Sequence, residues 1–321
     1  MTESGNPSSG RPESAGTGAP IDGRTGIPLS VVVTASAPWP GLRDCLDALV
    51  PQLAPAGAEL LVALGGANCR PPDPAAYGPG IRWIEMPGVS VFDQRARAIA
   101  QARGDVVALT EDHAWVAPGW CASILAAHAA HPGAVAIGGV VENGATGTRC
   151  DWANYLIGNG PFAAPIRNGP AVEISLQANV SYKRGELPPD LVRAGLAHLT
   201  FHRELRARGG WFAADDQVVV IHDQRHSFRE HSASHFHNGR SIAASRLSGM
   251  GTAMRALRAA GCAVLPAYML LRTTRAVIER GRHGREWRSS LPWIAWLLAC
   301  HAAGEFAGYV SGPGRSRERV H

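Results

Sequence analysis

The chain has 321 residues, of which 45% are hydrophobic and 18% are charged, and its formal net charge is +5. This composition excludes a disordered protein, and the length allows one large hydrophobic core or two smaller ones. The positive charge does not indicate nucleic-acid binding, because aromatic residues do not alternate with the clustered arginines as a base-stacking surface would require.

The N-terminus and the cysteines both indicate a cytoplasmic protein. Residues 1–26 are dominated by Ser, Gly, Pro and Thr without an apolar run, which predicts a disordered leader. That stretch also lacks the apolar core of a signal peptide. The six cysteines lie far apart with no CxxC pair, so we expect reduced thiols rather than disulfides or a metal cluster.

From residue 27 onward the chain alternates between strand and helix patterns. Short apolar runs predict strands over 29–34, 59–64, 81–84, 106–109 and 134–137. Helices are expected over 42–50, over 91–102 and from 118 onward. This alternation predicts an α/β fold with a mostly parallel sheet flanked by helices, in which ligands bind beyond the carboxyl ends of the strands.

The rest of the chain is less regular and becomes helical toward its end. We expect a helix over 198–208, a strand over 211–221 and a helical C-terminal region over 247–321, after an α/β domain over 27–246. Six arginines lie between Arg272 and Arg288 against two glutamates, a pattern typical of contact with anionic lipid. The apolar segment 291–310 is interrupted by His301 and Glu305, so we predict an interfacial or re-entrant helix rather than a span. The protein is therefore expected at the inner face of the cell membrane.

The strongest local motif is Leu109-Thr-Glu-Asp-His113, at the end of a predicted buried strand. Two adjacent carboxylates in such a place need a compensating cation. Glu111 and Asp112 can hold Mg²⁺ or Mn²⁺, and a nitrogen ligand from His113 favours Mn²⁺. In the alternative interpretation, the two acids cap the next helix and His113 lies on the surface.

An ordered set of segments resembles glycosyltransferase family 2, which has the GT-A fold. The set comprises Ser30-Val-Val-Val-Thr34, Glu59-Leu-Leu-Val62, Ala102-Arg-Gly-Asp-Val-Val-Ala-Leu109, the acidic cluster and Pro118-Gly-Trp120. The resemblance covers residues 27–142 well and 143–246 more loosely. It implies metal-assisted transfer of a sugar, with inversion, from a nucleotide-diphosphate donor to a hydroxyl of an acceptor such as a carbohydrate. The basic, apolar C-terminal region favours a lipid-linked or cell-envelope acceptor.

The resemblance also implies roles for residues on the donor side. The Asp-x-Asp motif of the family, which binds metal and sugar diphosphate, matches Thr110-Glu111-Asp112, so Asp112 carries over directly and Glu111 is a substitute ligand. Thr34 and Gly65, each at the end of a strand, would border the nucleotide. The family often has acidic residues that contact the nucleotide base at the position of Gly65. Because this chain lacks them, the identity of the nucleotide is not predicted. Arg95 either contacts a phosphate or lies on a solvated helix face.

The acceptor side is less defined. The position of the family's catalytic acid falls near His198, which could act as the base, with Glu204 and Asp190 as alternatives. Asn179 would border the sugar or form a turn. His222 would assist the metal or the diphosphate, or would be a satisfied structural histidine.

Two other functions are alternatives to glycosyl transfer. A membrane-attached protein that binds a nucleotide sugar without turning it over would explain the altered acidic motif and the missing acidic base. A dinucleotide-dependent oxidoreductase is disfavoured, because no GxGxxG follows the first strand.

Overall fold

The computed structural model describes residues 26–316, except 177, 194–197 and 248. The expected disordered leader therefore lies outside the described residues, apart from Gly26.

The described strands form one mixed sheet. They are β1 (Leu29–Ala35), β2 (Ala58–Leu64), β3 (Ile81–Glu85), β4 (Val106–Glu111), β5 (Ala114–Val116), β6 (Ala136–Asn143), β7 (Gly169–Ala171), β8 (Val180–Lys183) and β9 (Phe212–His222). Their order is β3-β2-β1-β4-β8-β6-β9-β5, and β7 also pairs with β9. The expectation of a mostly parallel sheet is corrected, because β8 runs antiparallel to both β4 and β6, and β5 and β7 run antiparallel to β9. The N-terminal half, β3-β2-β1-β4, is parallel as predicted.

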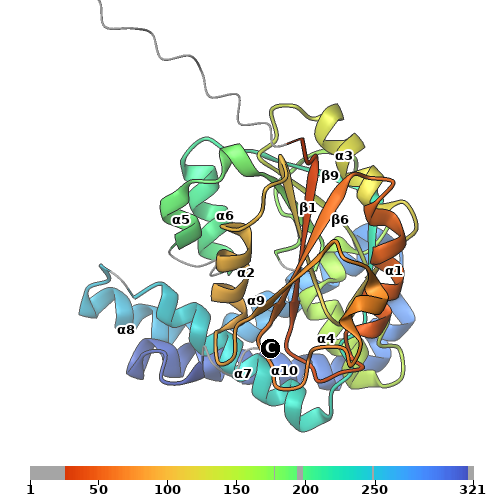
Figure 1. The fold of residues 1–321 in the computed structure, drawn as a ribbon. Helices are drawn as coiled ribbons and strands as arrows, with labels where there is room; N and C mark the ends of the chain where they lie inside the picture. Colours follow the sequence, from red (N-terminus) through yellow and green to blue (C-terminus); the bar gives the residue numbers. More distant parts are fainter. Residues whose placement is uncertain (1–25, 177, 194–197, 248, 317–321) are drawn as a thin grey trace, which may run out of the picture.

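Helices cover both faces of this sheet. They are α1 (Arg43–Leu53), α2 (Val91–Ile99), α3 (Trp120–Ala130), α4 (Arg149–Gly158), α5 (Pro189–Arg193), α6 (His198–Ala207), α7 (Phe228–Ser245), α8 (Thr252–Gly261), α9 (Leu265–Arg280) and α10 (Gly284–Ser311). Apolar residues of α1 and α3 share one core with Val31 and Val33 of β1. Apolar residues of α2, α5 and α6 pack on the opposite face, against Val32. Figure 1 shows α1 and α2 on opposite sides of the sheet, with α7 to α10 gathered at one end.

The C-terminal helices pack on the α/β region. Ile294, Leu297 and Leu298 of α10 share a buried cluster with Ala153 and Leu156 of α4. The segment 291–310, expected at a membrane interface, therefore buries much of its apolar surface inside the protein. The division after residue 246, just beyond α7, stays a prediction.

No single helix in the described part of the chain is long and apolar enough to cross a membrane. Only α8 and α9 pass that test together, and they are bent by 58° relative to each other.

Candidate functional site: a buried Glu-His-His cluster

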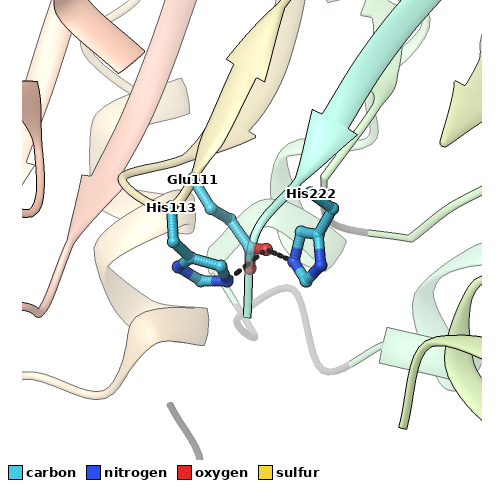
Figure 2. A group of neighbouring side chains, drawn as sticks. All are labelled: Glu111, His113 and His222. Carbon is cyan, nitrogen blue, oxygen red and sulfur yellow. Dashed lines mark hydrogen bonds and ion pairs between the residues drawn. The ribbon is translucent and has the colours of Figure 1, made fainter. Parts of the chain in front are cut away.

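Three strand ends bring the candidate site together. β4 ends at Glu111, which lies beside Thr34 of β1 in the parallel register. β5 pairs antiparallel with β9 so that Ala114 lies opposite His222, and this places His222 close to His113. Figure 2 shows the Glu111 carboxylate between the imidazole rings of His113 and His222. The carboxyl ends of β4 and β9 thus supply the cluster, as expected for a ligand site of an α/β sheet.

The three side chains lie within ligand distance of one common point. Oε2 of Glu111 is 3.1 Å from Nε2 of His222 and 3.5 Å from Nε2 of His113. The two rings meet edge to face, with centroids 4.7 Å apart. One ligand atom from each of the three residues lies within 4.8 Å of the other two. Glu111 and His222 are buried, whereas His113 is partly exposed.

The second oxygen of Glu111 is bound by an arginine. The guanidinium of Arg95, from α2, forms an ion pair with Oε1, and both side chains are buried. Burial opposes ionisation of Glu111, but Arg95, His222 and His113 together hold its pKa well below the ordinary value of 4.5. Arg95 is thus not a solvated surface residue, because it is buried and compensates the Glu111 charge. Its contact with a phosphate stays a prediction.

Asp112 is bound by the loop after β1 and by His113. Its Oδ2 accepts hydrogen bonds from the backbone N–H groups of Ser36 and Ala37, at 2.7 and 2.8 Å. Its Oδ1 lies 2.7 Å from Nδ1 of His113. Burial raises the pKa of Asp112, but the opposite effect of His113 and these amides is larger. The pKa of Asp112 therefore lies below its ordinary value of 3.8. Asp112 therefore orients His113, and the metal group found in the described residues consists of Glu111, His113 and His222 without it.

The donor set fits a divalent transition metal. One carboxylate oxygen and two imidazole nitrogens suit Mn²⁺ better than Mg²⁺, which prefers oxygen ligands. When Nδ1 of His113 donates to Asp112, Nε2 is free to coordinate, which is the carboxylate–histidine arrangement common at metal sites. The sequence predicted Glu111, Asp112 and His113 as ligands, with His222 assisting the metal or the diphosphate. The residues that lie together in the structure are Glu111, His113 and His222.

Thr34 lies beside this cluster, and Gly65 lies one strand farther away. The Thr34 hydroxyl is buried and has no hydrogen-bond partner among the described residues, so it is available to a ligand. A Cβ at Gly65 would clash with the side-chain amide of Gln94, so close packing against α2 explains this glycine. A contact of either residue with a nucleotide stays a prediction.

Of the two roles expected for Asn179, the contacts favour the structural one, within the sheet rather than in a turn. Its side chain is 0% exposed. The amide accepts from Nε1 of Trp120 at 3.0 Å and donates to the carbonyl oxygens of Val140 and Val218, each at 2.8 Å. These bonds cross the irregular register between β6 and β9. Asn179 therefore fixes the sheet and has no donor left for a sugar.

The structure does not identify a catalytic base. His198 is the first residue of α6, but its side chain lies outside the described part of the chain. Glu204 is partly exposed on the same helix, and no hydrogen bond or ion pair links it to the Glu111 cluster. Asp190 forms an ion pair with Arg208 at 2.6 Å on the surface. The base therefore stays a prediction.

Sequence reasoning missed two interactions: the Arg95–Glu111 ion pair and the binding of Asp112 by the loop after β1. The amides that hold Asp112 belong to residues 75 and 76 positions away. No local pattern predicts such contacts, because they join segments that are distant in the sequence.

Comparison with known proteins supports the resemblance. The profile of "Glycosyl transferase family 2" matches residues 30–175. No curated protein sequence matches significantly. A mannosyltransferase from Pyrobaculum calidifontis, solved with GDP-Man and Mn²⁺, is similar in fold at 17% identity, with a TM-score of 0.53 and coverage of 86% of this chain and 85% of that one. S. aureus TarS, residues 1–349, aligns at 12% identity with a TM-score of 0.47, over 89% of this chain and 92% of that one.

The matched range holds the strand order β3-β2-β1-β4 and two members of the buried cluster, Glu111 and His113. Residues 30–175 of this chain therefore match glycosyl transferase family 2, and the sheet with its flanking helices has a GT-A-like fold.

Proposed function

We propose that the protein transfers a sugar from a nucleotide-diphosphate donor to a hydroxyl acceptor, with a divalent cation at Glu111, His113 and His222. The observation that carries the proposal is the buried Glu-His-His donor set at the carboxyl end of β4, within a family 2 domain. A bound cation would neutralise charge on the diphosphate leaving group.

The side chains around the cluster have distinct tasks in this proposal. Glu111, His113 and His222 hold the cation, and Asp112 keeps Nε2 of His113 turned toward it. Arg95, on the other oxygen of Glu111, would hold this carboxylate in place, and its guanidinium is the positive group that would assist the diphosphate oxygens. Inversion, and a base near His198 or Glu204, rest on the family resemblance.

Binding of nucleotide sugars tests the proposal. We expect one member of a nucleotide-sugar panel, beginning with GDP-mannose, to raise the melting temperature in the presence of Mn²⁺ and to be hydrolysed slowly. Glu111→Gln should abolish both effects, whereas Glu85→Gln, at the exposed end of β3, should leave them intact. If no nucleotide sugar shifts the melting temperature, the proposal is wrong.

A second candidate is a nucleotide-sugar-binding protein without turnover. The ion pair between Arg95 and Glu111, which compensates the buried carboxylate without a cation, favours it. Such a protein would show the thermal shift without hydrolysis or transfer to any acceptor.

We also propose that α8 and α9, rather than α10, rest on an anionic membrane surface on the cytoplasmic side. The two helices and Val264, the residue before α9, expose six large apolar side chains: Met254, Leu257, Val264, Tyr268, Leu271 and Ile278. From Val264 through α9 these recur at spacings of four, three and seven residues, which is one helical face. The two helices carry five arginines and one acidic residue, which suits anionic headgroups.

Vesicle flotation tests this contact. The protein should float with vesicles that contain phosphatidylglycerol and remain at the bottom with phosphatidylcholine alone. Leu271→Asp and Ile278→Asp, at positions 69% and 73% exposed, should abolish flotation. Phe306→Asp, exposed on α10, should not. Equal loss in all three variants, or no flotation of the wild type, would contradict a contact through α8 and α9.

A further inference from the structure

A second recess lies next to the candidate site, on the same face of the sheet. It has a volume of about 580 Å³ and is enclosed by β6, the segment 161–174 and α9. Its charged lining residues are Arg167, Arg272, Arg275, Arg280, Glu173 and Glu279. Four positive and two negative charges leave an excess of two positive charges, which suits a dianionic ligand.

The strand register places this recess within reach of the cluster. Gly138, in its wall, lies opposite Val180 of β8, and Val180 lies opposite Leu109 of β4. Leu109 precedes Glu111 by two residues, so the side chains of both point to the same face. Two strand spacings across and two residues along give a separation of about 12 Å between Gly138 and Glu111. One or two sugar units or a short linker would bridge that distance.

Two of the arginines are held only by exposed ion pairs. Arg272 contacts both oxygens of Glu173, at 2.9 and 2.7 Å, and Arg275 contacts Glu279 at 2.6 Å. The four side chains in these pairs are between 41% and 80% exposed. Exposed pairs of this kind contribute little free energy, so an incoming anion can replace the glutamates.

Arg280 has a different task. Its two terminal nitrogens donate to the carbonyl oxygens of Pro165 and Pro161, at 2.8 and 2.6 Å. It therefore fixes the segment that forms the opposite wall. Pro161, Phe162 and Pro170 make that wall apolar, which suits a sugar ring or chain attached to the anion.

We propose that this recess binds a phosphate group of the acceptor, with Arg272 and Arg275 as its ligands. This inference rests on the proposed glycosyl transfer, and it makes the acceptor a phosphorylated or phosphodiester-containing molecule. A phosphate monoester carries a charge between about −1.5 and −2 at neutral pH, which matches the excess positive charge. Arginine pairs bind its oxygens in bidentate geometry.

Calorimetric titration with inorganic phosphate tests the proposal. The double variant Arg272→Gln/Arg275→Gln should bind phosphate at least about tenfold more weakly, because charge-assisted hydrogen bonds are lost. Glu173→Gln should bind it several-fold more tightly, because a competing carboxylate is gone. Arg258→Gln, an exposed arginine on α8 outside the recess, should match the wild type.

Dihexanoyl phosphatidate, used as a monomer, distinguishes a lipid-linked from a soluble acceptor. If the protein binds dihexanoyl phosphatidate more tightly than inorganic phosphate, and Leu271→Asp removes this difference, the acceptor is lipid-linked. If the protein binds both with equal affinity, the acceptor is soluble. Phosphate affinity that is the same in the double arginine variant and in the wild type overturns the proposal.

The donor assay separates this failure from failure of the proposed function. Nucleotide sugars with Mn²⁺ should shift the melting temperature of the double arginine variant as they shift that of the wild type. If no donor binds either protein while phosphate binding still depends on Arg272 and Arg275, the glycosyl transfer fails and the anion site stands.

Discussion

At the scale of single residues, the Glu111 carboxylate is surrounded by one guanidinium and two imidazoles. Because Glu111 and Arg95 are both buried, neither charge can be left uncompensated without a large cost in stability. Arg95 on Oε1 and a cation at Oε2 would therefore both compensate the charge of this carboxylate.

Replacement of Arg95 tests that relation. Arg95→Met should lower the free energy of unfolding by about 3–5 kcal/mol without metal, because it leaves Glu111 buried and unpaired. Mn²⁺ should raise the melting temperature of Arg95→Met more than that of the wild type, because the cation takes over the compensation. Arg97→Met, exposed on the same helix, should behave as the wild type. Equal effects of Mn²⁺ on all three proteins would rule out a cation at Glu111.

Asp112 is expected to orient the His113 ring through its hydrogen bond to Nδ1, without binding the metal itself. Asp112→Asn should weaken Mn²⁺ binding by about 10–100-fold, the usual effect of losing a carboxylate that orients a histidine ligand. Titration of the Mn²⁺ electron paramagnetic resonance signal measures this affinity, and the exposed Asp105→Asn serves as control. An unchanged affinity in Asp112→Asn would show that His113 does not depend on Asp112.

At the scale of helices and strands, α7 and α10 cross with their backbones in contact. A Cβ at Gly304 of α10 would clash with the carbonyl oxygen of Phe236, and one at Gly239 of α7 would clash with that of His301. Glycine is required at both positions, because any side chain would force the two helices apart.

A pair of alanine variants measures this contact. Gly304→Ala should lower the free energy of unfolding by about 1–3 kcal/mol through overpacking. Gly261→Ala at the end of α8, where a Cβ meets nothing within 4 Å, should be neutral or slightly stabilising. Urea unfolding gives both values, and a neutral Gly304→Ala would contradict the tight crossing.

The sequence predicted best the strands that are marked by a local run of apolar residues. β1, β2 and β4 are continuous apolar runs and were found within one or two residues. β6 was expected to end at residue 137 but continues to Asn143, because Gly138 and Gly139 interrupt the apolar run while β9 still pairs with it. The direction of β8 could not be predicted, since it depends on which neighbours the strand inserts between.

The same limit applies to the site. Glu111 and His113 could be placed because they directly follow a predicted strand, and His222 because it ends another. The partners of Arg95, Asn179 and Asp112 depend on packing between distant segments. The apolar face of α10 was predicted correctly as apolar, but the sequence could not show that α4 and α7 cover it.

At the scale of the whole molecule, buried histidines make the stability depend on pH. Burial is the main cause that lowers the pKa of His128 to about 4, and of His202 and His235 to about 3, from 6.5. Below pH 6.5 the unfolded chain takes up protons that the folded protein does not. Their full contribution to stability is therefore present above pH 6.5 and is lost as the pH falls toward 4.

Unfolding at several pH values tests this dependence. Each of these histidines should cost about 2 kcal/mol of stability between pH 7.5 and pH 5. His202→Gln, which keeps a partner for the Tyr182 hydroxyl, should show a shallower decline, because one titrating group is gone. A decline as steep as that of the wild type would mean that His202 does not contribute.

The close crossing of α7 and α10 also bears on how far the Glu111 cluster would lie from a membrane surface. No side chains separate the two backbones, and α10 also packs on α4. The Tyr155 hydroxyl of α4 donates to the Val141 carbonyl oxygen of β6, so the helical end is tied to the sheet. If Leu271 and Ile278 rest on a bilayer, the Glu111 cluster is held at one fixed height above the lipid. An acceptor would then be selected by the distance between its lipid anchor and its reacting hydroxyl.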